Sequence, residues 1–346
     1  MAGDKPFFIT QNAGFLEADA SVDLLHTDRT KAVGEDSATE TQYFGFSVPE
    51  EGIHSLDYLW HRPNLGIITG GVWTWRGIKA SAPWSEMCDI HTFMNDSALA
   101  GDLHEYRLAN GYGVKMLEPM KRFHMTYRDP VRDNAIDVLF EGMSPVVLWA
   151  DGNHIEQAMR ATGTLVLRGK RYKVDSTTVR DRSWGKSRPE TIMTLPPPSW
   201  MTGVFGPDFS FNCNCFDQVE GNPELEPPFA MPREKTLNGG WLWRDGKLGR
   251  IIDAKKSVAR TPGALLPAGV EVECRDEHGR GFHLRGRLVA SCPWETWANV
   301  SMSISLMRWE CEGRVAYGDC QEALWGDYLN FMADRERGAR RGIASG

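Results

Sequence analysis

Short runs rich in β-branched and aromatic residues recur along this chain, separated by turn residues, while helical periodicity is scarce. The clearest runs are residues 43–48, 56–61, 66–75, 87–94, 114–127, 163–167, 172–180, 209–216, 240–253, 269–274, 281–291 and 300–311. Runs of this kind are typical of strands, and residues 168–171 and 276–281 have the composition of hairpin turns. Only residues 321–335 show a helical pattern. The sequence therefore predicts an all-β fold of antiparallel barrels or sandwiches with a short C-terminal helix.

The length and an internal similarity predict two domains. The chain has 346 residues, and single hydrophobic cores stop growing at roughly 250–300 residues. Residues 70–77 and 239–246 share two tryptophans and an arginine at the same spacing. Duplication of one β-unit would explain this, and so would chance similarity between two tryptophan-rich strands. A triple proline at 196–198 interrupts any strand or helix, so we expect one β-domain over 1–190 and a second over 191–346.

Composition excludes several classes of partner. The chain carries 39 basic and 46 acidic side chains, a net charge of −7, whereas nucleic-acid binding needs a concentrated basic surface. No window approaches the roughly 18 apolar residues of a membrane span, and the N-terminus lacks the apolar centre of a signal peptide. Seven scattered cysteines without a Cys-x-x-Cys pair are typical of reduced, mostly buried thiols. We expect a cytoplasmic protein whose partner is a small hydrophobic substrate, and a homodimer is left open.

Thirteen tryptophans are the most unusual feature of the composition. Residues two apart in a strand share a face, so Trp73 and Trp75 project together. Such a pair either fills a core or lines a cavity, and this many flat rings favour a cavity for an apolar ligand. The residues expected to bind substrate are Tyr43, Trp60, Trp73, Trp75, Trp184 and Arg188.

The familiar cofactor and nucleophile motifs are missing from the sequence. It contains no Gly-x-Gly-x-x-Gly, no phosphate-binding Gly-Lys-Ser/Thr loop, no Gly-x-Ser-x-Gly and no His-Glu-x-x-His. No cofactor and no metal are therefore predicted. His91, His104 and His124 lie near carboxylates within a few strands, which keeps a metal as an alternative, although their spacing matches no compact ligand motif.

Histidine and carboxylate residues share strand faces at three places. Asp57 shares a face with His61, Asp89 with His91, and Glu156 with His154. A neighbouring carboxylate orients an imidazole and raises its pKa, as general acid–base catalysis requires. The alternative for each pair is a cross-strand hydrogen bond or a solvated face. The candidate catalytic residues include His61, His91 and His154, and Tyr58 or Tyr43 could donate to a substrate oxygen.

The most concentrated group of charges lies at residues 179–188, where Asp181 is flanked by Arg180, Arg182 and Arg188. Opposite charge keeps a carboxylate ionised. Asp181, held by Arg180 and Arg188, is therefore expected to orient a catalytic imidazole or to stabilise developing positive charge. The alternative is a structural Arg–Asp network that packs against Trp184.

With this segment the sequence resembles a known family. Residues 180–185, preceded by 154–157 and a hairpin containing Gly163, resemble the Asp-His/Arg-x-Trp-Gly signature of the carotenoid hydratase (AttH-like) superfamily, and bacterial relatives with Arg-Asp-His-Ser-Trp-Gly are more similar still. Residues 41–44 and 58–64 are also similar to those relatives. The resemblance implies two tandem lipocalin-like β-domains and cofactor-free chemistry on hydrophobic substrates, such as hydration of an isoprenoid double bond. This chain has Arg182 where many relatives have histidine, which argues against proton transfer at that position.

Two main hypotheses about function follow. The first is a cofactor-independent lyase, either a hydratase/dehydratase or a carbon–carbon lyase that releases formaldehyde, acting by acid–base catalysis on a bulky aromatic or isoprenoid substrate. The alternative is a non-catalytic lipocalin-like carrier of a hydrophobic ligand, in which no histidine and carboxylate would converge. A third hypothesis is a metal-dependent enzyme, which predicts that a chelator abolishes activity.

Overall fold

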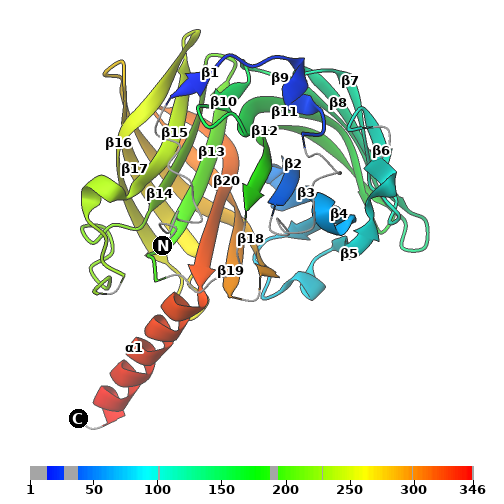
Figure 1. Cartoon of the computed structure of the whole chain (residues 1–346). Coiled ribbons are helices and arrows are strands. Elements are labelled where there is room, and N and C mark those ends of the chain that lie inside the picture. Colours follow the sequence, from blue (N-terminus) through cyan, green and yellow to red (C-terminus); the bar gives the residue numbers. More distant parts are fainter. Residues whose placement is uncertain are drawn as a thin grey trace.

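The computed structural model describes residues 14–26, 38–99, 102–187, 194–227, 229–297 and 299–344. Most of these residues are in strands, and one α-helix, α1 (Gly326–Ala344), projects from the body (Figure 1). The predicted all-β fold with a C-terminal helix is confirmed. None of the described helices is both long and apolar enough to span a membrane.

The N-terminal half forms a 12-stranded antiparallel sheet that curls on itself (Figure 1). Ten strands follow the order β5-β4-β3-β2-β12-β11-β9-β8-β7-β6, while β10 pairs with β11 and β1 pairs with β10. The strands are β1 (Phe15–Leu16), β2 (Ala38–Val48), β3 (Ile53–Arg62), β4 (Ile67–Arg76), β5 (Met87–Asn95), β6 (Glu105–Arg107), β7 (Gly113–Glu118), β8 (Arg122–Asp129), β9 (Asn134–Gly142), β10 (Val147–Trp149), β11 (His154–Leu167) and β12 (Lys170–Ser187). The expected turn at Arg168-Gly169 joins β11 to β12, and both residues have positive φ, as tight hairpins require.

Side chains connect the two ends of this sheet. Asn110, between β6 and β7, donates to the carbonyls of Gly70 and Asp89, 3.1 and 2.6 Å away. The Tyr127 hydroxyl donates to the Asp89 carboxylate at 2.6 Å. Gly71 has φ +145°, and a Cβ there would lie 2.0 Å from the Asp89 carbonyl oxygen. The Asn110 side-chain nitrogen would also lie 2.4 Å from that Cβ, so glycine is needed at this position for β5 and Asn110 to approach the backbone.

The C-terminal half is a closed barrel of eight antiparallel strands, because β20 pairs back to β13. Its strands are β13 (Pro198–Gly206), β14 (Phe209–Phe216), β15 (Leu237–Arg244), β16 (Lys247–Arg260), β17 (Pro267–Asp276), β18 (Gly281–Trp297), β19 (Val300–Cys311) and β20 (Arg314–Trp325). The helix was expected to begin near residue 321, but 321–325 belong to β20. Pairing of all five residues with β19, and of 321 and 322 with β13 as well, overrides their helical pattern.

Short 3-10 turns fill several connections of the described chain: η1 (Ala20–Asp23), η2 (Pro49–Glu51), η3 (Pro63–Leu65), η4 (Ala82–Trp84), η5 (Asp96–Leu99) and η6 (Arg233–Lys235). The proline-rich stretch from 220 to 235 has η6 as its sole regular element among its described residues. The turn at 276–281 joins β17 to β18, as expected.

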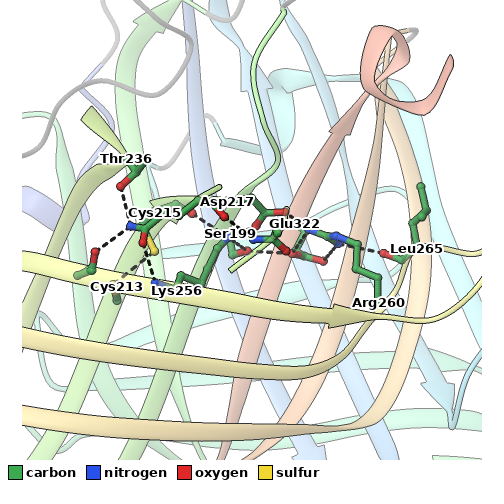
Figure 2. A network of polar contacts seen from close by, with 12 residues as sticks. Ser199, Cys213, Cys215, Asp217, Thr236, Lys256, Arg260, Leu265 and Glu322 are labelled. Carbon is green, nitrogen blue, oxygen red and sulfur yellow. Dashed lines mark hydrogen bonds and ion pairs between the residues drawn. The ribbon is translucent and has the colours of Figure 1, made fainter. Parts of the chain in front are cut away.

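A buried ionic network lies within the barrel (Figure 2). The Lys256 ammonium is 2.6 Å from both the Asp217 carboxylate and the Ser199 hydroxyl. Arg260 bonds Asp217 at 2.6 Å and Glu322 at 2.8 Å. Two cations and two anions therefore balance, which is how buried charges are tolerated.

The outer faces of the sheet and the barrel pack against each other, and we call this region the junction. One apolar group joins Tyr43, Leu56, Trp73 and Trp75 of the sheet to Ala290, Cys292, Ile304 and Leu306 of the barrel. A second joins Val147, Trp149, Ala158 and Val179 to Val204 and Trp241. Trp200 packs against both groups. Both tryptophan pairs of the internal similarity therefore lie at the junction, while the division into domains at 1–190 and 191–346 stays a prediction.

Candidate active site at the junction

An imidazole and two carboxylates converge where β11 and β12 face the barrel. His154 and Glu156 share a face of β11, and Glu156 is the register partner of Asp181 on β12. The His154 Nε2 atom lies 2.6 Å from Asp181 Oδ2 and 3.9 Å from Glu156 Oε1. Within the part of the chain that the structure describes, no other group of three potential ligand side chains is as compact.

The three side chains differ in their exposure. Glu156 is fully buried, whereas the side chains of His154 and Asp181 are 12% and 20% exposed. The cluster therefore reaches solvent through Asp181 and His154, and Glu156 forms its buried end. A reactant arriving from solvent would meet the His154–Asp181 pair first.

The barrel contributes two indole donors to Glu156. Trp200 on β13 donates from Nε1 at 2.6 Å, and Trp241 on β15 donates to the other carboxylate oxygen. Burial and the nearby charge of Asp181 raise the pKa of Glu156, while the charge of His154 and the indole bonds act to lower it. Glu156 is thus bound to both halves of the chain.

A second polar group lies beside the first. Asp319 on β20 accepts a 3.0 Å hydrogen bond from the Tyr43 hydroxyl and lies 2.8 Å from His54 Nε2. Tyr43 is the register partner of Asp181, and its ring meets Trp200 edge-on at 6.1 Å. Burial, followed by the charge of Asp319, raises the pKa of the Tyr43 phenol well above its usual value. Tyr43 and Trp200 therefore link the two polar groups.

The spacing in the first group is that of a hydrogen-bonded pair. His154, Glu156 and Asp181 place three potential ligand atoms within 4.8 Å of one another, so they could approach one cation. Atoms that bind one zinc ion at about 2.1 Å in tetrahedral geometry are more than ~3 Å apart. The 2.6 Å separation of His154 and Asp181 is shorter and matches a charge-assisted hydrogen bond.

Several of the predicted site residues share the sheet face that carries this cluster. One row of register partners crosses β11, β12, β2 and β3 and comprises Glu156, Asp181, Tyr43 and Tyr58. The next row comprises His154, Ser183, Thr41 and Trp60. The Tyr58 ring packs edge-on against Trp294 of the barrel at 5.4 Å, and Arg62 covers the ring of Trp60.

The other two predicted histidines lie elsewhere. His61 is buried on the opposite face of β3, where its Nε2 lies 3.1 Å from Asp96. His91 lies on β5, the edge strand; its side chain is 54% exposed, with Asp89 2.8 Å away. The structure does not bring either of them to His154.

The remaining predicted substrate-binding residues are dispersed. Trp73 and Trp75 are fully buried in the junction, with ring centroids 4.6 Å apart. Trp184 stacks on His26 at 3.9 Å. Arg188 lies outside the described residues.

The expectation that Arg180 holds Asp181 is wrong. Arg180 donates to Asp23 at 2.6 Å and to Gln157 at 2.9 Å, and Arg182 pairs with Glu40. Successive residues of a strand point to opposite faces. Both arginines therefore face the inside of the curled sheet, whereas Asp181 faces the junction.

Sequence reasoning did not identify the contributions of the barrel. Asp319, Trp200 and Trp241 come from three barrel strands and meet residues of the sheet that are at least 44 positions away. Strand periodicity indicates which face a side chain occupies, but not which distant strand covers it. The sequence similarity between residues 70–77 and 239–246, which contain Trp73 and Trp241, was the single signal that pointed to this region.

The fold and this cluster define an all-β protein of a curled sheet and a closed barrel, with a polar site at their junction. The chain belongs to the family described as "Domain of unknown function (DUF7064)", whose model matches residues 25–326.

Two solved structures are similar to this chain in their overall fold. Kievitone hydratase from Nectria haematococca has a TM-score of 0.49 at 9% identity, covering 88% of this chain and 94% of that one. An AttH-like protein from Nitrosomonas europaea has a TM-score of 0.48 at 10% identity, covering 87% and 97%. No curated protein matches the chain in sequence.

Proposed function

We propose that this protein is a cofactor-independent lyase that acts as a hydratase or dehydratase, with His154 and Asp181 as its proton-transfer pair. The observation that carries the proposal is the 2.6 Å contact of His154 Nε2 with Asp181 Oδ2, beside the buried Glu156. A carboxylate at this distance orients an imidazole and stabilises the imidazolium that forms during proton transfer.

The proposed reaction requires His154 to accept and return a single proton. In dehydration, His154 accepts a proton from the carbon next to the alcohol carbon and returns it to the departing hydroxyl, so an alcohol becomes an alkene and water. Hydration is the reverse. The negative charges of Asp181 and Glu156, 2.6 and 3.9 Å from the imidazole, stabilise its charged form while it holds the proton.

Aromatic surroundings support a bulky hydrophobic substrate, aromatic or isoprenoid. The ring of Trp149 lies 6.4 Å from that of His154, and Trp200 and Trp241 contact Glu156 directly. A carrier of an apolar ligand has no need for an imidazole bonded to a carboxylate at this place, which favours the enzyme over the carrier. We also propose a cytoplasmic location, supported by seven free cysteines of which six are buried.

The test is turnover in labelled water. The full chain is incubated in H₂¹⁸O with panels of aromatic and prenylated alkenes and alcohols, and products are followed by mass spectrometry. We expect an alkene to gain one labelled water, and His154→Ala to lower the rate by about 10²- to 10⁴-fold. The control is His91→Ala, which removes an exposed histidine that is also paired with an aspartate. Full turnover by a folded His154→Ala variant contradicts the proposal, and binding of these compounds without any conversion supports the carrier.

A further inference from the structure

A row of barrel side chains faces the junction beneath Glu156. Thr202 on β13, Asn212 on β14 and Trp241 on β15 are register partners. Directly paired residues of neighbouring antiparallel strands project from the same face. Trp241 reaches the junction and donates to Glu156, so Asn212 faces the junction as well.

The two indoles that hold Glu156 stand on either side of β14. Trp241 pairs with Asn212, and Trp200 on the opposite neighbouring strand pairs with Asn214. Both indole N–H groups meet at one carboxylate. Asn212 and Asn214, which share a face of β14, therefore both lie between the bases of the two indoles, on the side from which Glu156 approaches the barrel.

The amide of Asn212 is fully buried, and among the residues that the structure describes neither its Oδ1 nor its Nδ2 has a hydrogen-bond partner. Buried side-chain amides are nearly always hydrogen-bonded in native proteins, because an unpaired one loses its bonds to water without replacement. The neighbouring Thr202 hydroxyl already accepts a bond from the Asp319 amide. The Asn212 side chain therefore keeps a hydrogen-bond donor and an acceptor open beside Glu156, the buried end of the cluster that Glu156 forms with His154 and Asp181.

We propose that Asn212 and Glu156 bind a neutral hydroxyl oxygen, either the water of the reaction or a hydroxyl of the substrate. A hydroxyl both donates and accepts, which matches the one open acceptor and the open donors of the amide. An anion would leave the amide oxygen unmatched and would be repelled by the nearby carboxylates. This subsite deepens the proposed hydratase function and rests on it for the role of the bound oxygen.

A matched control lies on the same strand. Ser210 is two residues from Asn212, is also fully buried, and its hydroxyl likewise has no partner among the described residues. Its register partners are Val204 and Trp243, neither of which bonds Glu156. Ser210→Ala therefore removes a comparable polar group one row away from the proposed subsite.

The first test is a high-resolution crystal structure of the full chain, before and after soaking in isopropanol. We expect a density peak within hydrogen-bond distance of both the Asn212 amide and Glu156, which Asn212→Leu removes and Ser210→Ala retains. A peak that isopropanol displaces supports a substrate hydroxyl, and one that stays as water supports the reacting water. The subsite is overturned if no density peak lies beside the Asn212 amide, if this amide is hydrogen-bonded to protein groups, or if the peak is a metal ion.

The second test separates the subsite from the proton-transfer pair. With the alkene identified by the labelled-water screen, Asn212→Leu is expected to lower turnover by roughly tenfold or more, and Ser210→Ala to leave it unchanged. A fall in kcat at constant KM identifies the reacting water, whereas a rise in KM identifies a substrate hydroxyl. Unchanged kinetics in a folded Asn212→Leu variant overturn the subsite even if His154→Ala is inactive. An active His154→Ala with a retained density peak contradicts the proposed proton-transfer pair alone.

Discussion

The Tyr43 hydroxyl donates a 3.0 Å hydrogen bond to Asp319, a residue 276 positions further along the chain. Tyr43 lies on β2 of the sheet and Asp319 on β20 of the barrel, so the bond crosses the junction. His54 lies 2.8 Å from the other oxygen of the same carboxylate. A Cβ at Gly45 would lie 2.0 Å from the Tyr43 hydroxyl, so only glycine at this position lets the phenol reach Asp319. One buried carboxylate thus holds two side chains of the opposite half.

Removing this carboxylate should destabilise the whole chain. Asp319→Ala leaves the Tyr43 hydroxyl and the His54 ring buried at the junction without their shared partner, and we expect the free energy of unfolding to fall by about 1–3 kcal/mol for each of the two groups. Urea denaturation followed by tryptophan fluorescence measures the change. Asp175→Ala is the control, because that carboxylate is 39% exposed and its ion pair with Arg160 is worth less than about 1 kcal/mol. Equal losses in the two variants would contradict a structural role for the Asp319 contacts.

Asp57 should make stability fall as pH rises. Its side chain is fully buried, with one oxygen 3.3 Å from the Ser55 hydroxyl, and burial raises its pKa well above the usual value. Above about pH 4 the unfolded chain loses this proton while the folded chain keeps it, so folding is opposed by up to about 1.4 kcal/mol per pH unit until the folded pKa is reached. Asp57→Asn lacks this dependence, so the variant should gain stability relative to the wild type between pH 4 and 8. Parallel stability curves across that range would show that Asp57 is not protonated in the folded protein.

The stability of the folded protein should depend on each member of the ionic network in the barrel. Lys256→Met removes one cation from a balanced set of four charges, leaving Arg260 to neutralise both Asp217 and Glu322 (Figure 2). We expect a loss of about 3–5 kcal/mol in the free energy of unfolding, as when other buried ion pairs lose one partner. Lys173→Met is the matched control, because that side chain is 81% exposed on the sheet and pairs with Asp175. Stability close to wild type in Lys256→Met would mean that the network contributes little beyond its packing.

Turnover should not depend on a metal. The 2.6 Å contact between His154 and Asp181 is a hydrogen bond, and a cation would have to separate these two atoms to bind both. Dialysis against EDTA is therefore expected to leave the rate of the labelled-water reaction unchanged, with elemental analysis confirming removal of divalent ions. Loss of activity with recovery on adding a divalent ion would instead establish the metal-dependent alternative.

Local patterns predicted much of the fold. The run at 209–216 coincides with β14 (Phe209–Phe216), and the hairpin turns at 168–171 and 276–281 lie where expected. These features depend on residues close together in sequence, whose strand and turn preferences act within a few positions. The start of α1 was expected five residues too early, because pairing with β19, joined at 321 and 322 by pairing with β13, decides the state of 321–325.

The sequence alone determined the all-β class, the period of the strands and the shared face of His154 and Glu156, since a period of two is a local property of the backbone. It did not determine which histidine meets two carboxylates, or that Arg180 turns away from Asp181 to bind Asp23. The tertiary structure decided that Trp200, Trp241 and Asp319 of the barrel cover the outer face of the sheet. The physical reason is that contacts between strands far apart in the chain follow from how two complete apolar faces pack, and no short stretch of residues carries that information.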